Sequence, residues 1–479
     1  MPASRIEELI SRSNVRFGTS GARGLVADMT DEVCYAYTAA FIQNVAGPAK
    51  QIVLGHDLRP SSPSIAAACA AAIKDAGRDT VYAGALPTPA LAFYAAQLKL
   101  PALVITGSHI PFDRNGIKFY RVEGEISKAD EAAMLNAVIE LPVKVTPAIL
   151  PVADEGAVQA YMQRYLDFFA CGALEGMRVA VYEHSSVARD VLRSILEKLG
   201  ANVISLGRTD IFVPIDTEAV RPEDVVQARK WAQENTFDAI ISTDGDADRP
   251  LIGDERGHWL RGDMVGILCA QYMRAEVVVT PVSSNTAVEK CGSFKTVLRT
   301  RIGSPYVIAG MESCLSKNAN VVGYEANGGF LLGSDVVHHS RFMAALPTRD
   351  AILPILALLC LAGERNCKLS QLARDLPARF TASDRLQNFA TLESQALLAR
   401  LLESTDLLNS TLAPQSGDVI SIDQTDGLRV TFNSGDIVHL RPSGNAPELR
   451  CYAESASPER AQALCDTCLQ RVRIQAQTV

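Results

Sequence analysis

The sequence predicts an α/β protein with three mixed α/β domains of similar topology, followed by a smaller C-terminal α+β domain. Strand-like and helix-like segments alternate in three successive series, which indicates an internal triplication. Each series ends in an apolar strand that is followed by a polar loop containing glycine. The last quarter instead has short strands followed by one long helix, which favours a small antiparallel sheet.

In the first two series, short apolar runs alternate with longer helical patterns, and Gly77 and Gly200 close helices. Ligands of open α/β sheets bind beyond the carboxyl ends of the strands, so the polar loops that end the series are the expected binding site. The first series comprises strand 51–55, helix 62–76, strand 80–83, helix 89–98 and strand 102–106. The second comprises strand 178–182, helix 188–199, strand 202–206, helix 223–235 and strand 238–243. The third comprises strands 276–280 and 295–300, helix 305–316 and strand 320–324.

Proline and glycine residues also predict the domain boundaries, and apolar patterns predict the elements of the last domain. A proline-rich stretch at 141–151, a glycine turn at 257–262 and a break at 375–378 mark the expected boundaries. The predicted domains are residues 1–150, 151–260, 261–375 and 376–479. The last domain comprises strands 427–432, 437–441 and 449–453 and helix 457–477, and helical patterns at 353–361 and 392–402 are expected to face the core.

Composition excludes several classes of protein. The 479 residues, 48% hydrophobic and 21% charged, are ordinary for a soluble multi-domain protein, and no apolar run reaches membrane-spanning length. The first 14 residues contain no apolar signal core, so a cytoplasmic location is expected. The 46 basic and 54 acidic residues give a net charge of −8, which argues against a nucleic-acid surface. An anionic ligand would therefore need a local basic pocket.

The cysteines do not indicate a disulfide framework. There are 11 of them, an odd number, scattered in apolar helical surroundings. Cys465 and Cys468 form a C-x-x-C pair, but it lies inside a helical pattern without a second Cys or His pair nearby. We therefore expect the cysteines to be buried, reduced thiols.

The loop that follows strand 102–106 combines groups suited to catalysis. It places the hydroxyl of Ser108, the imidazole of His109 and the amine of Lys118 on one segment shaped by glycine and proline. A Ser-His pair alone is common in loops, and a lone lysine is usually a solvated cation. The chemical meaning of this segment therefore depends on the next loop.

The loop that follows strand 238–243 predicts a hard-cation site. Asp244, Asp246 and Asp248 alternate with small residues, and three like charges so close together repel one another unless they are solvated or bound to a cation. The run lacks the glycine and distal glutamate of an EF-hand, and a surface turn is the alternative. Arg249 suits a site at which a metal and a guanidinium share phosphate oxygens.

Two further glycine-containing segments carry arginines suited to phosphate binding. Arg23 lies in F-G-T-S-G-A-R-G at 17–24, and Arg441 lies in R-P-S-G-N-A-P at 441–447 together with Ser443 and Asn445. Glycines let backbone amides approach phosphate oxygens, and the Ser, Asn and Arg side chains supply further donors. Each segment alone could be a simple turn.

Taken together, these motifs resemble the alpha-D-phosphohexomutases along nearly the whole chain, with four signature loops in the family's order. The resemblance implies four domains around one central cleft. It also implies a serine that is phosphorylated in the resting enzyme, here Ser108, and Mg²⁺ held by that phosphate and by the three Asp. Lys118 matches the general acid/base. Glu325 and Asn327 match the sugar-binding loop, and Arg441, Ser443 and Asn445 match the phosphate-binding loop.

The implied reaction interconverts a hexose 1-phosphate and a hexose 6-phosphate. The serine phosphate passes to a sugar hydroxyl, the resulting hexose 1,6-bisphosphate turns around, and its other phosphate returns to Ser108. Lys118 removes the acceptor proton if its pKa is lowered. Arg23 and Arg249 are expected to steady the phosphoserine, and His109 to position the loop or polarise the sugar. Small sugar phosphates are the expected ligands, Mg²⁺ the cofactor, and a hexose 1,6-bisphosphate the activator.

The chain departs from the family pattern at four positions. Ile110 stands where an Asn is usual, although Pro111 still restricts its backbone. Asn327 replaces a frequent Ser and reaches further. Arg301 stands where Lys is frequent and presents a planar fork. Ala446 replaces a frequent Thr and removes one potential phosphate donor.

The sequence leaves several sugar phosphates open as the substrate. Ala247 and Ala22 differ from the pattern of the family's glucosamine-specific members, so an amino sugar is disfavoured. A mannose phosphate is the first expectation and a glucose phosphate the second. Two alternatives belong to other classes: a Mg²⁺-dependent sugar-phosphate phosphatase, in which water takes the phosphoryl group, and a non-catalytic sugar-phosphate sensor.

Overall fold

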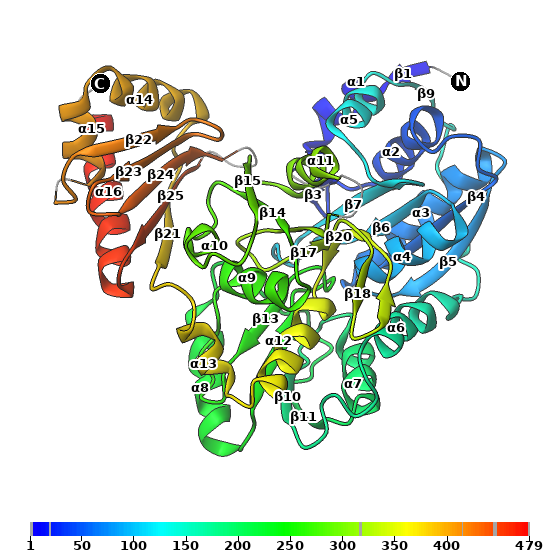
Figure 1. Cartoon of the computed structure of the whole chain (residues 1–479). Coiled ribbons are helices and arrows are strands. Elements are labelled where there is room, and N and C mark those ends of the chain that lie inside the picture. Colours follow the sequence, from blue (N-terminus) through cyan, green and yellow to red (C-terminus); the bar gives the residue numbers. More distant parts are fainter. Residues whose placement is uncertain (1–2, 19–20, 316–318, 414, 444–447, 478–479) are drawn as a thin grey trace.

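The chain folds into three α/β domains and one antiparallel C-terminal domain, which follow one another along the colour ramp of Figure 1. The computed structural model describes residues 3–18, 21–315, 319–413, 415–443 and 448–477. Among these residues, no helix is both long enough and apolar enough to cross a membrane.

The first sheet has the strand order β2-β3-β7-β6-β4-β5, with β8 added beside β7. Apolar side chains alternate between its faces: Leu54 and Ile105 pack under α2 and α3, whereas Val53 and Val104 pack against α4. Its strands are β2 (Arg16–Phe17), β3 (Ala22–Leu25), β4 (Gln51–His56), β5 (Asp79–Ala85), β6 (Ala102–Ile105), β7 (Arg114–Arg121) and β8 (Gly124–Glu125). Its helices are α2 (Asp31–Asn44), α3 (Ser62–Asp75) and α4 (Thr88–Leu98). Around it lie β1 (Ala3–Arg5), α1 (Ile6–Ser13), α5 (Lys128–Leu135) and β9 (Val138–Glu140).

The second and third sheets have the orders β11-β10-β12-β13 and β15-β14-β16-β17-β20. The second domain contains α6 (Gly156–Phe168), β10 (Arg178–Tyr182), α7 (Arg189–Lys198), β11 (Asn202–Leu206), α8 (Pro222–Glu234), β12 (Ala239–Thr243) and β13 (Pro250–Gly253). The third contains α9 (Gly262–Tyr272), β14 (Val277–Pro281), α10 (Ala287–Lys290), β15 (Thr296–Thr300), α11 (Ser304–Cys314), β16 (Val321–Tyr324), β17 (Phe330–Leu332), β18 (Val336–His338), β19 (Arg341–Met343), β20 (Leu346–Asp350) and α12 (Ile352–Glu364).

One unit of topology occurs three times. In each sheet a central strand (β4, β10 or β14) has a parallel neighbour on either side, and the later neighbour (β6, β12 or β16) pairs with an antiparallel strand (β7, β13 or β17). The polar loop of each series joins that last antiparallel pair. The predicted fold class, with its three similar domains, is therefore confirmed.

The strands β3 and β7 were not predicted from the sequence, and this corrects two placements. Lys118 lies on β7 and not on the loop that carries Ser108, and Arg23 lies on β3 and not on a glycine-rich turn. Arg441 lies on β24, in agreement with the predicted strand 437–441. Charged and glycine residues interrupt the apolar alternation of β7, so its pattern is weak. Pairing with β6 and β3 on either side holds it in the sheet.

The three α/β domains share one apolar core. It joins side chains of β4, β10 and β14, and α12, which is buried from Ile352 to Ala362, lies within it. These domains are therefore packed as one body.

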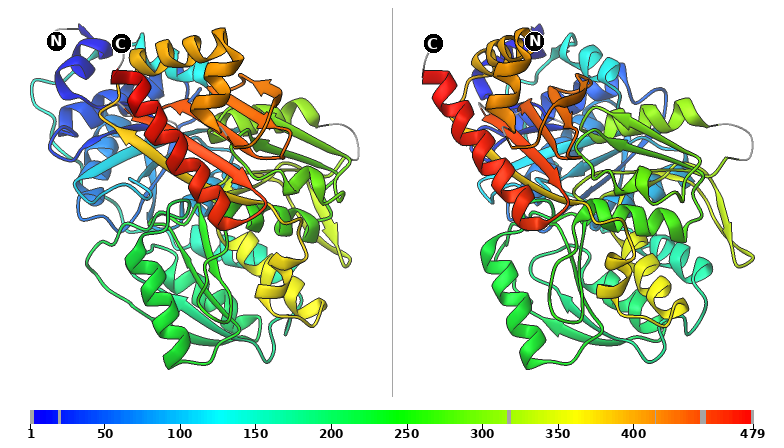
Figure 2. Two further views of the ribbon diagram at one scale, coloured as in Figure 1. Left: turned by 90° about the vertical axis from the view of Figure 1, so that its left-hand side faces the viewer. Right: turned by 60° about the vertical axis from the view of Figure 1, so that its left-hand side comes forward.

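The C-terminal sheet is antiparallel, with the order β21-β25-β24-β23-β22, and it has its own core. Figure 2 shows α16 lying diagonally across the sheet. Cys465 and Cys468 are buried in this core, as the sequence interpretation expects. The last elements are α13 (Leu369–Arg374), β21 (Phe380–Gln387), α14 (Thr391–Glu403), α15 (Thr405–Leu412), β22 (Val419–Asp423), β23 (Leu428–Phe432), β24 (Ile437–Pro442), β25 (Glu448–Ser455) and α16 (Pro458–Gln477).

Polar contacts connect this domain to the third one. Glu454 accepts a hydrogen bond from the backbone N–H of Thr286 at 3.0 Å and pairs with Arg379 at 2.5 Å. Asn285 Nδ2 donates to the carbonyl oxygen of Arg379 at 2.7 Å. The C-terminal domain is thus attached to the third domain through hydrogen bonds at this contact, and the Arg379–Glu454 ion pair lies within the C-terminal domain and holds Glu454 in place.

A buried carboxylate, Asp436, is expected to make the C-terminal domain sensitive to acid. Burial by itself raises its pKa, but hydrogen bonds from Arg460, Ser455 and Ser416 outweigh burial and lower the pKa to about 2. A lowered pKa stabilises the fold above the unfolded-state value near 4, and this stabilisation is lost as pH falls from about 4 to about 2. With allowance for screening, Asp436→Asn should cost about 1 to 2 kcal/mol of unfolding free energy at pH 7.

Thermal unfolding of the native chain and of Asp436→Asn at pH 7 and at about pH 2 measures this. The difference in thermal stability between the native chain and Asp436→Asn should be clear at pH 7 and small at about pH 2. Asp418→Asn, at an exposed position, is the control and should match the native chain throughout. An undiminished difference in acid would show that the ionised carboxylate is not the source.

Candidate active site

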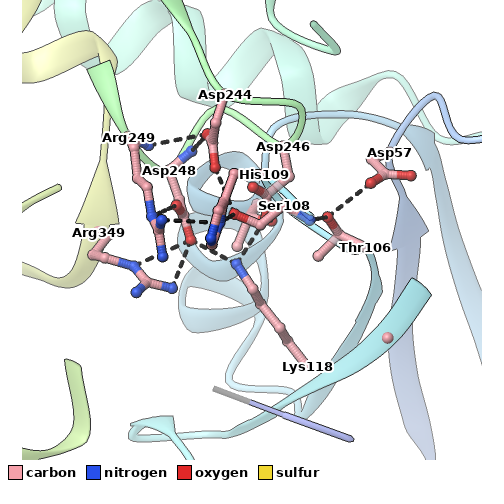
Figure 3. Close-up of polar contacts among 12 residues, drawn as sticks. Asp57, Thr106, Ser108, His109, Lys118, Asp244, Asp246, Asp248, Arg249 and Arg349 are labelled. Carbon is pink, nitrogen blue, oxygen red and sulfur yellow. Dashed lines mark hydrogen bonds and ion pairs between the residues drawn. The ribbon is translucent and has the colours of Figure 1, made fainter. Parts of the chain in front are cut away.

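Loops of the first and second domains meet at Ser108. Its Oγ donates a hydrogen bond of 2.5 Å to Oδ2 of Asp244, although the two residues are 136 positions apart in the chain. Figure 3 shows the Asp loop and Ser108 facing each other, with Lys118 and Arg349 beside them. Gly245 makes the approach possible, because a Cβ there would lie 2.9 Å from the carbonyl oxygen of Ser108. The topology thus brings two of the predicted loops to one point.

The backbone of Ser108 is held in an unusual conformation. Its φ is +53°, in the left-handed region that residues other than glycine rarely adopt, and the residue is fully buried. Its N–H donates to Oγ1 of Thr106 at 2.8 Å, and that hydroxyl donates to Asp57 at 2.8 Å. Such strain persists at functional sites where surrounding contacts fix the geometry.

The three Asp side chains form a buried carboxylate cluster. One oxygen from each lies within 4.8 Å of the others, and among the described residues Oδ1 of Asp246 and Oδ1 of Asp248 have no hydrogen-bond partner, although Nε of Arg249 lies 3.6 Å from Oδ1 of Asp248. Burial raises the pKa of Asp244 well above its usual range, and the charges of Asp246 and Asp248 raise it further. A divalent cation would bind the two unpartnered oxygens and offset the repulsion. The donor set, all carboxylate oxygen, therefore fits Mg²⁺.

Lys118 is in contact with this cluster. Its Nζ lies 2.7 Å from Oδ2 of Asp246 and 2.6 Å from Oδ2 of Asp248. Burial by itself lowers the pKa of Lys118, but the two carboxylates outweigh burial, so the pKa is raised. The expectation that a base role needs a lowered pKa is therefore not met in this geometry.

Three arginines, Arg249, Arg23 and Arg349, lie close enough to His109, the neighbour of Ser108, to help keep its imidazole neutral. Arg249 donates to Nδ1 of His109 at 2.9 Å, and burial, Arg249 and Arg23 lower the pKa of His109 well below its usual value. Burial, Arg249 and Arg349 lower the pKa of Arg23 to about 10. Guanidinium groups that repel one another in this way are a favourable setting for a phosphate dianion.

Glu325 and Asn327 lie on the third polar loop, between β16 and β17. Both are nearly buried. Oδ1 of Asn327 accepts a hydrogen bond from the N–H of Gly329 at 2.9 Å, and the carbonyl oxygen of Asn327 accepts one from Thr217 at 2.6 Å. The side chain of Asn327 thus helps to hold the loop itself.

Arg349, on β20, connects two loops, which we name after their predicted roles: the metal loop at residues 244–248 and the sugar loop at residues 325–329. The sequence motifs did not indicate Arg349. Its Nε and Nη2 donate to Oδ2 of Asp248 at 3.1 and 2.7 Å, and its Nη1 donates to Glu325 at 3.0 Å. It fits because Gly329 has no side chain: a Cβ there would lie 2.7 Å from Cδ of Arg349. In the sequence, Gly329 was the one residue that could have indicated a close contact at this position.

The remaining predicted residues gather where the third domain contacts the C-terminal domain. Nε of Arg441 lies 2.9 Å from Asp426, and Arg301 donates to the carbonyl oxygen of Thr425 at 3.0 Å. Ser443 is buried. Asn445 lies outside the described residues, as does Ala446.

A pocket lies between the sugar loop and the C-terminal sheet. Ala326 of the sugar loop, Arg261 and Glu218 line one side, and Arg429 and Tyr452 line the other. Because Glu325 and Asn327 flank Ala326, this predicted group borders a pocket formed by residues of three domains.

Comparison with known proteins places this architecture in a family. Four models described as phosphoglucomutase/phosphomannomutase domains match it: alpha/beta/alpha domain I at residues 14–141, domain II at 159–257, domain III at 261–380 and the C-terminal domain at 366–470. The chain belongs to the phosphoglucomutase/phosphomannomutase family, that is, to the alpha-D-phosphohexomutases.

Individual relatives cover almost the whole chain. A phosphomannomutase of Salmonella muenchen is 47% identical over 471 residues, 97% of each chain, and one of Sinorhizobium fredii is 44% identical over 94% of this chain and 97% of its own. A phosphoglucosamine mutase of Carboxydothermus hydrogenoformans is 29% identical over 94% of this chain and 97% of its own. The solved structure of a putative phosphomannomutase from Thermus thermophilus superposes with a TM-score of 0.78 over 96% of this chain and 99% of its own, at 22% identity, a likeness in fold.

Proposed function

We propose that this phosphohexomutase acts on mannose, interconverting mannose 1-phosphate and mannose 6-phosphate through a phosphorylated Ser108. The observation that carries the proposal is the 2.5 Å contact between Ser108 Oγ and Asp244 within a buried cluster of carboxylates and cations. Two relatives above 40% identity that are named phosphomannomutases support mannose over glucosamine.

Asp244, Asp246 and Asp248 are the proposed Mg²⁺ ligands. Bound there, Mg²⁺ would neutralise negative charge on the transferring phosphoryl group. Arg23 and Arg249 would hold the remaining phosphoryl oxygens, since both guanidiniums lie among like charges that an anion relieves. His109, neutral and 3.4 Å from Ser108 Oγ, would orient the serine loop without adding charge.

In the proposed transfer, the bond between phosphorus and Ser108 Oγ breaks as a bond forms between phosphorus and a sugar hydroxyl oxygen. The hydroxyl proton passes to the neutral amine of Lys118, which has first released to solvent the proton that Asp246 and Asp248 stabilise, and Ser108 Oγ leaves with the electron pair of the broken bond. Glu325, oriented by Arg349, would bind the sugar hydroxyls. Arg301 and Arg441, with Ser443 and Asn445, would bind the phosphate that is not reacting.

The product of this first transfer is a mannose 1,6-bisphosphate, which would turn around and return its other phosphate to Ser108. A trace of the same bisphosphate would act as the activator, because it can phosphorylate an enzyme whose serine is free. Sugar phosphates are thus the proposed partners of the pocket.

Conversion of mannose, glucose and glucosamine 1-phosphates to their 6-phosphates, followed by ³¹P NMR with Mg²⁺ and trace bisphosphate, tests the proposal. We expect kcat/KM to rank mannose first, glucose second and glucosamine last. Glucosamine ranking first would overturn the sugar assignment. Release of inorganic phosphate in place of isomerisation would identify a phosphatase, and binding without conversion would identify a sensor.

A further inference from the structure

A buried ion pair, Asp57 and Arg59, lies behind the loop that carries Ser108. Both residues are 1% exposed and lie on the turn between β4 and α3. Nε of Arg59 is 3.3 Å from Oδ2 of Asp57. Burying a guanidinium is costly unless its donors are used, so the contacts of Arg59 indicate why it is there.

The guanidinium of Arg59 binds four carbonyl oxygens of one loop. Nη1 donates to those of Pro111 and Arg114 at 2.7 and 2.9 Å, and Nη2 donates to those of Ser108 and Ile110 at 2.9 and 2.6 Å. A planar fork suits this arrangement, whereas an ammonium group offers a single point of charge. Arg59 therefore fixes the path of the loop on both sides of His109.

Asp57 holds the same loop from its other end. Its Oδ2 accepts a hydrogen bond from Thr106 Oγ1, which itself accepts the N–H of Ser108. The ion pair thus holds the N–H of Ser108 through Thr106 and the carbonyl oxygen of Ser108 directly. These two restraints act across the residue whose φ is +53°.

Neighbouring groups pack closely on the guanidinium. A Cβ on Gly107 would lie 2.5 Å from Cζ of Arg59, so this glycine is required for the contact. The ring of Phe212 lies 4.1 Å from Cζ of Arg59, and Phe212 belongs to the second domain, which also carries the Asp cluster. Arg59 therefore contacts both of the domains whose loops meet at Ser108.

The geometry assigns to Arg59 the role of a positioning residue, which aims Ser108 Oγ at the Asp cluster for phosphoryl transfer. This role rests on the proposed function. It also explains how Ile110 is accommodated although its side chain can neither donate nor accept a hydrogen bond: Arg59 binds the backbone carbonyl oxygen of Ile110, a group that every residue type supplies.

Arg59→Lys tests the role, because it keeps the charge and removes the fork. We expect kcat for mannose 1-phosphate to fall about 100-fold, since small misplacement of a reacting group costs that much. KM should change less than about threefold, because other loops bind the sugar and its distal phosphate. Phosphoserine prepared with the bisphosphate should still form, and it should lose inorganic phosphate faster than in the native chain, because a loosened loop admits water.

Arg164→Lys is the matched control. Arg164 is also a buried arginine near an aromatic ring, with its Cζ 5.0 Å from the ring of Phe93, but it lies on α6 away from the loop. It should lower thermal stability at most and leave kcat unchanged. Gly107→Ala is the second variant, because it keeps Arg59 and displaces its guanidinium; the same separation of kcat from KM is expected.

A kcat of Arg59→Lys within about threefold of native, or an equal loss in Arg164→Lys, would overturn the role of Arg59. If Arg59→Lys does not fold, native kcat in a folded Gly107→Ala chain would overturn it as well. Failure of the proposed function is distinguishable, because the chain with Ser108→Ala would then remain active.

Discussion

Replacing Ser108 with alanine should lower kcat for mannose 1-phosphate by at least about 10⁴-fold, because it removes the hydroxyl that we propose receives and returns the phosphoryl group. Ser108 Oγ lies between Asp244 and His109, and the charged groups around it all remain in the variant. The loss should therefore reflect chemistry and not the collapse of the site. Coupled assays at saturating Mg²⁺ and bisphosphate measure it.

Intact mass spectrometry gives an independent readout of the same prediction. The native chain treated with mannose 1,6-bisphosphate should gain one phosphoryl group, and the Ser108→Ala chain should gain none. Ser64→Ala, an exposed serine on α3, is the control and should retain native kcat and phosphorylation. Conversion that persists in the Ser108→Ala chain would remove the phosphoserine mechanism.

Replacing Arg349 with methionine should lower kcat by about 10³-fold, the upper range for losing one preorganised charged donor. Without Arg349, Asp248 loses two hydrogen bonds and Glu325 loses the one that orients it, so both the metal loop and the sugar loop are affected. Additional Mg²⁺ or substrate should not restore the rate. Arg349→Lys should recover part of it, because the charge returns without the fork.

The control for this experiment is Arg341→Met. Arg341 lies on β19, in the same domain, and its Nη1 donates to carbonyl oxygens of α6 and of the residue that follows it. Methionine there should leave kcat unchanged, and thermal unfolding of both variants separates folding from activity. A rate for Arg349→Met within about tenfold of native would show that Arg349 serves only packing.

The repeated α/β units were predictable from local patterns. The predicted strands 178–182 and 202–206 have the limits of β10 and β11, because Gly200 ends the intervening helix and apolar runs define both strands. The strand β7 could not be predicted from local patterns, because Arg114–Arg121 is extended through its pairing within the sheet and not through its own composition. Lys118 consequently lies on a strand whose direction only the sheet determines.

Only the loop residues of the candidate site could be predicted from the sequence. Ser108, Asp244, Asp246 and Asp248 stand out because each follows a predicted strand and carries a distinctive run of residues. Arg59 and Arg349 stand in no such run. Their roles depend on contacts with residues 49 and 101 positions away, namely Ser108 and Asp248.

By itself, the sequence determined the three α/β units, the loops that end them and the chemical groups that those loops carry, because periodicity and motif spacing are local properties of a chain. Only the tertiary structure decided which carboxylate receives the Ser108 hydroxyl, why the pKa of Lys118 is raised, and which arginines hold the loops in place. Those properties arise from charges that are distant in the chain and adjacent in a buried site, where burial strengthens every interaction between them.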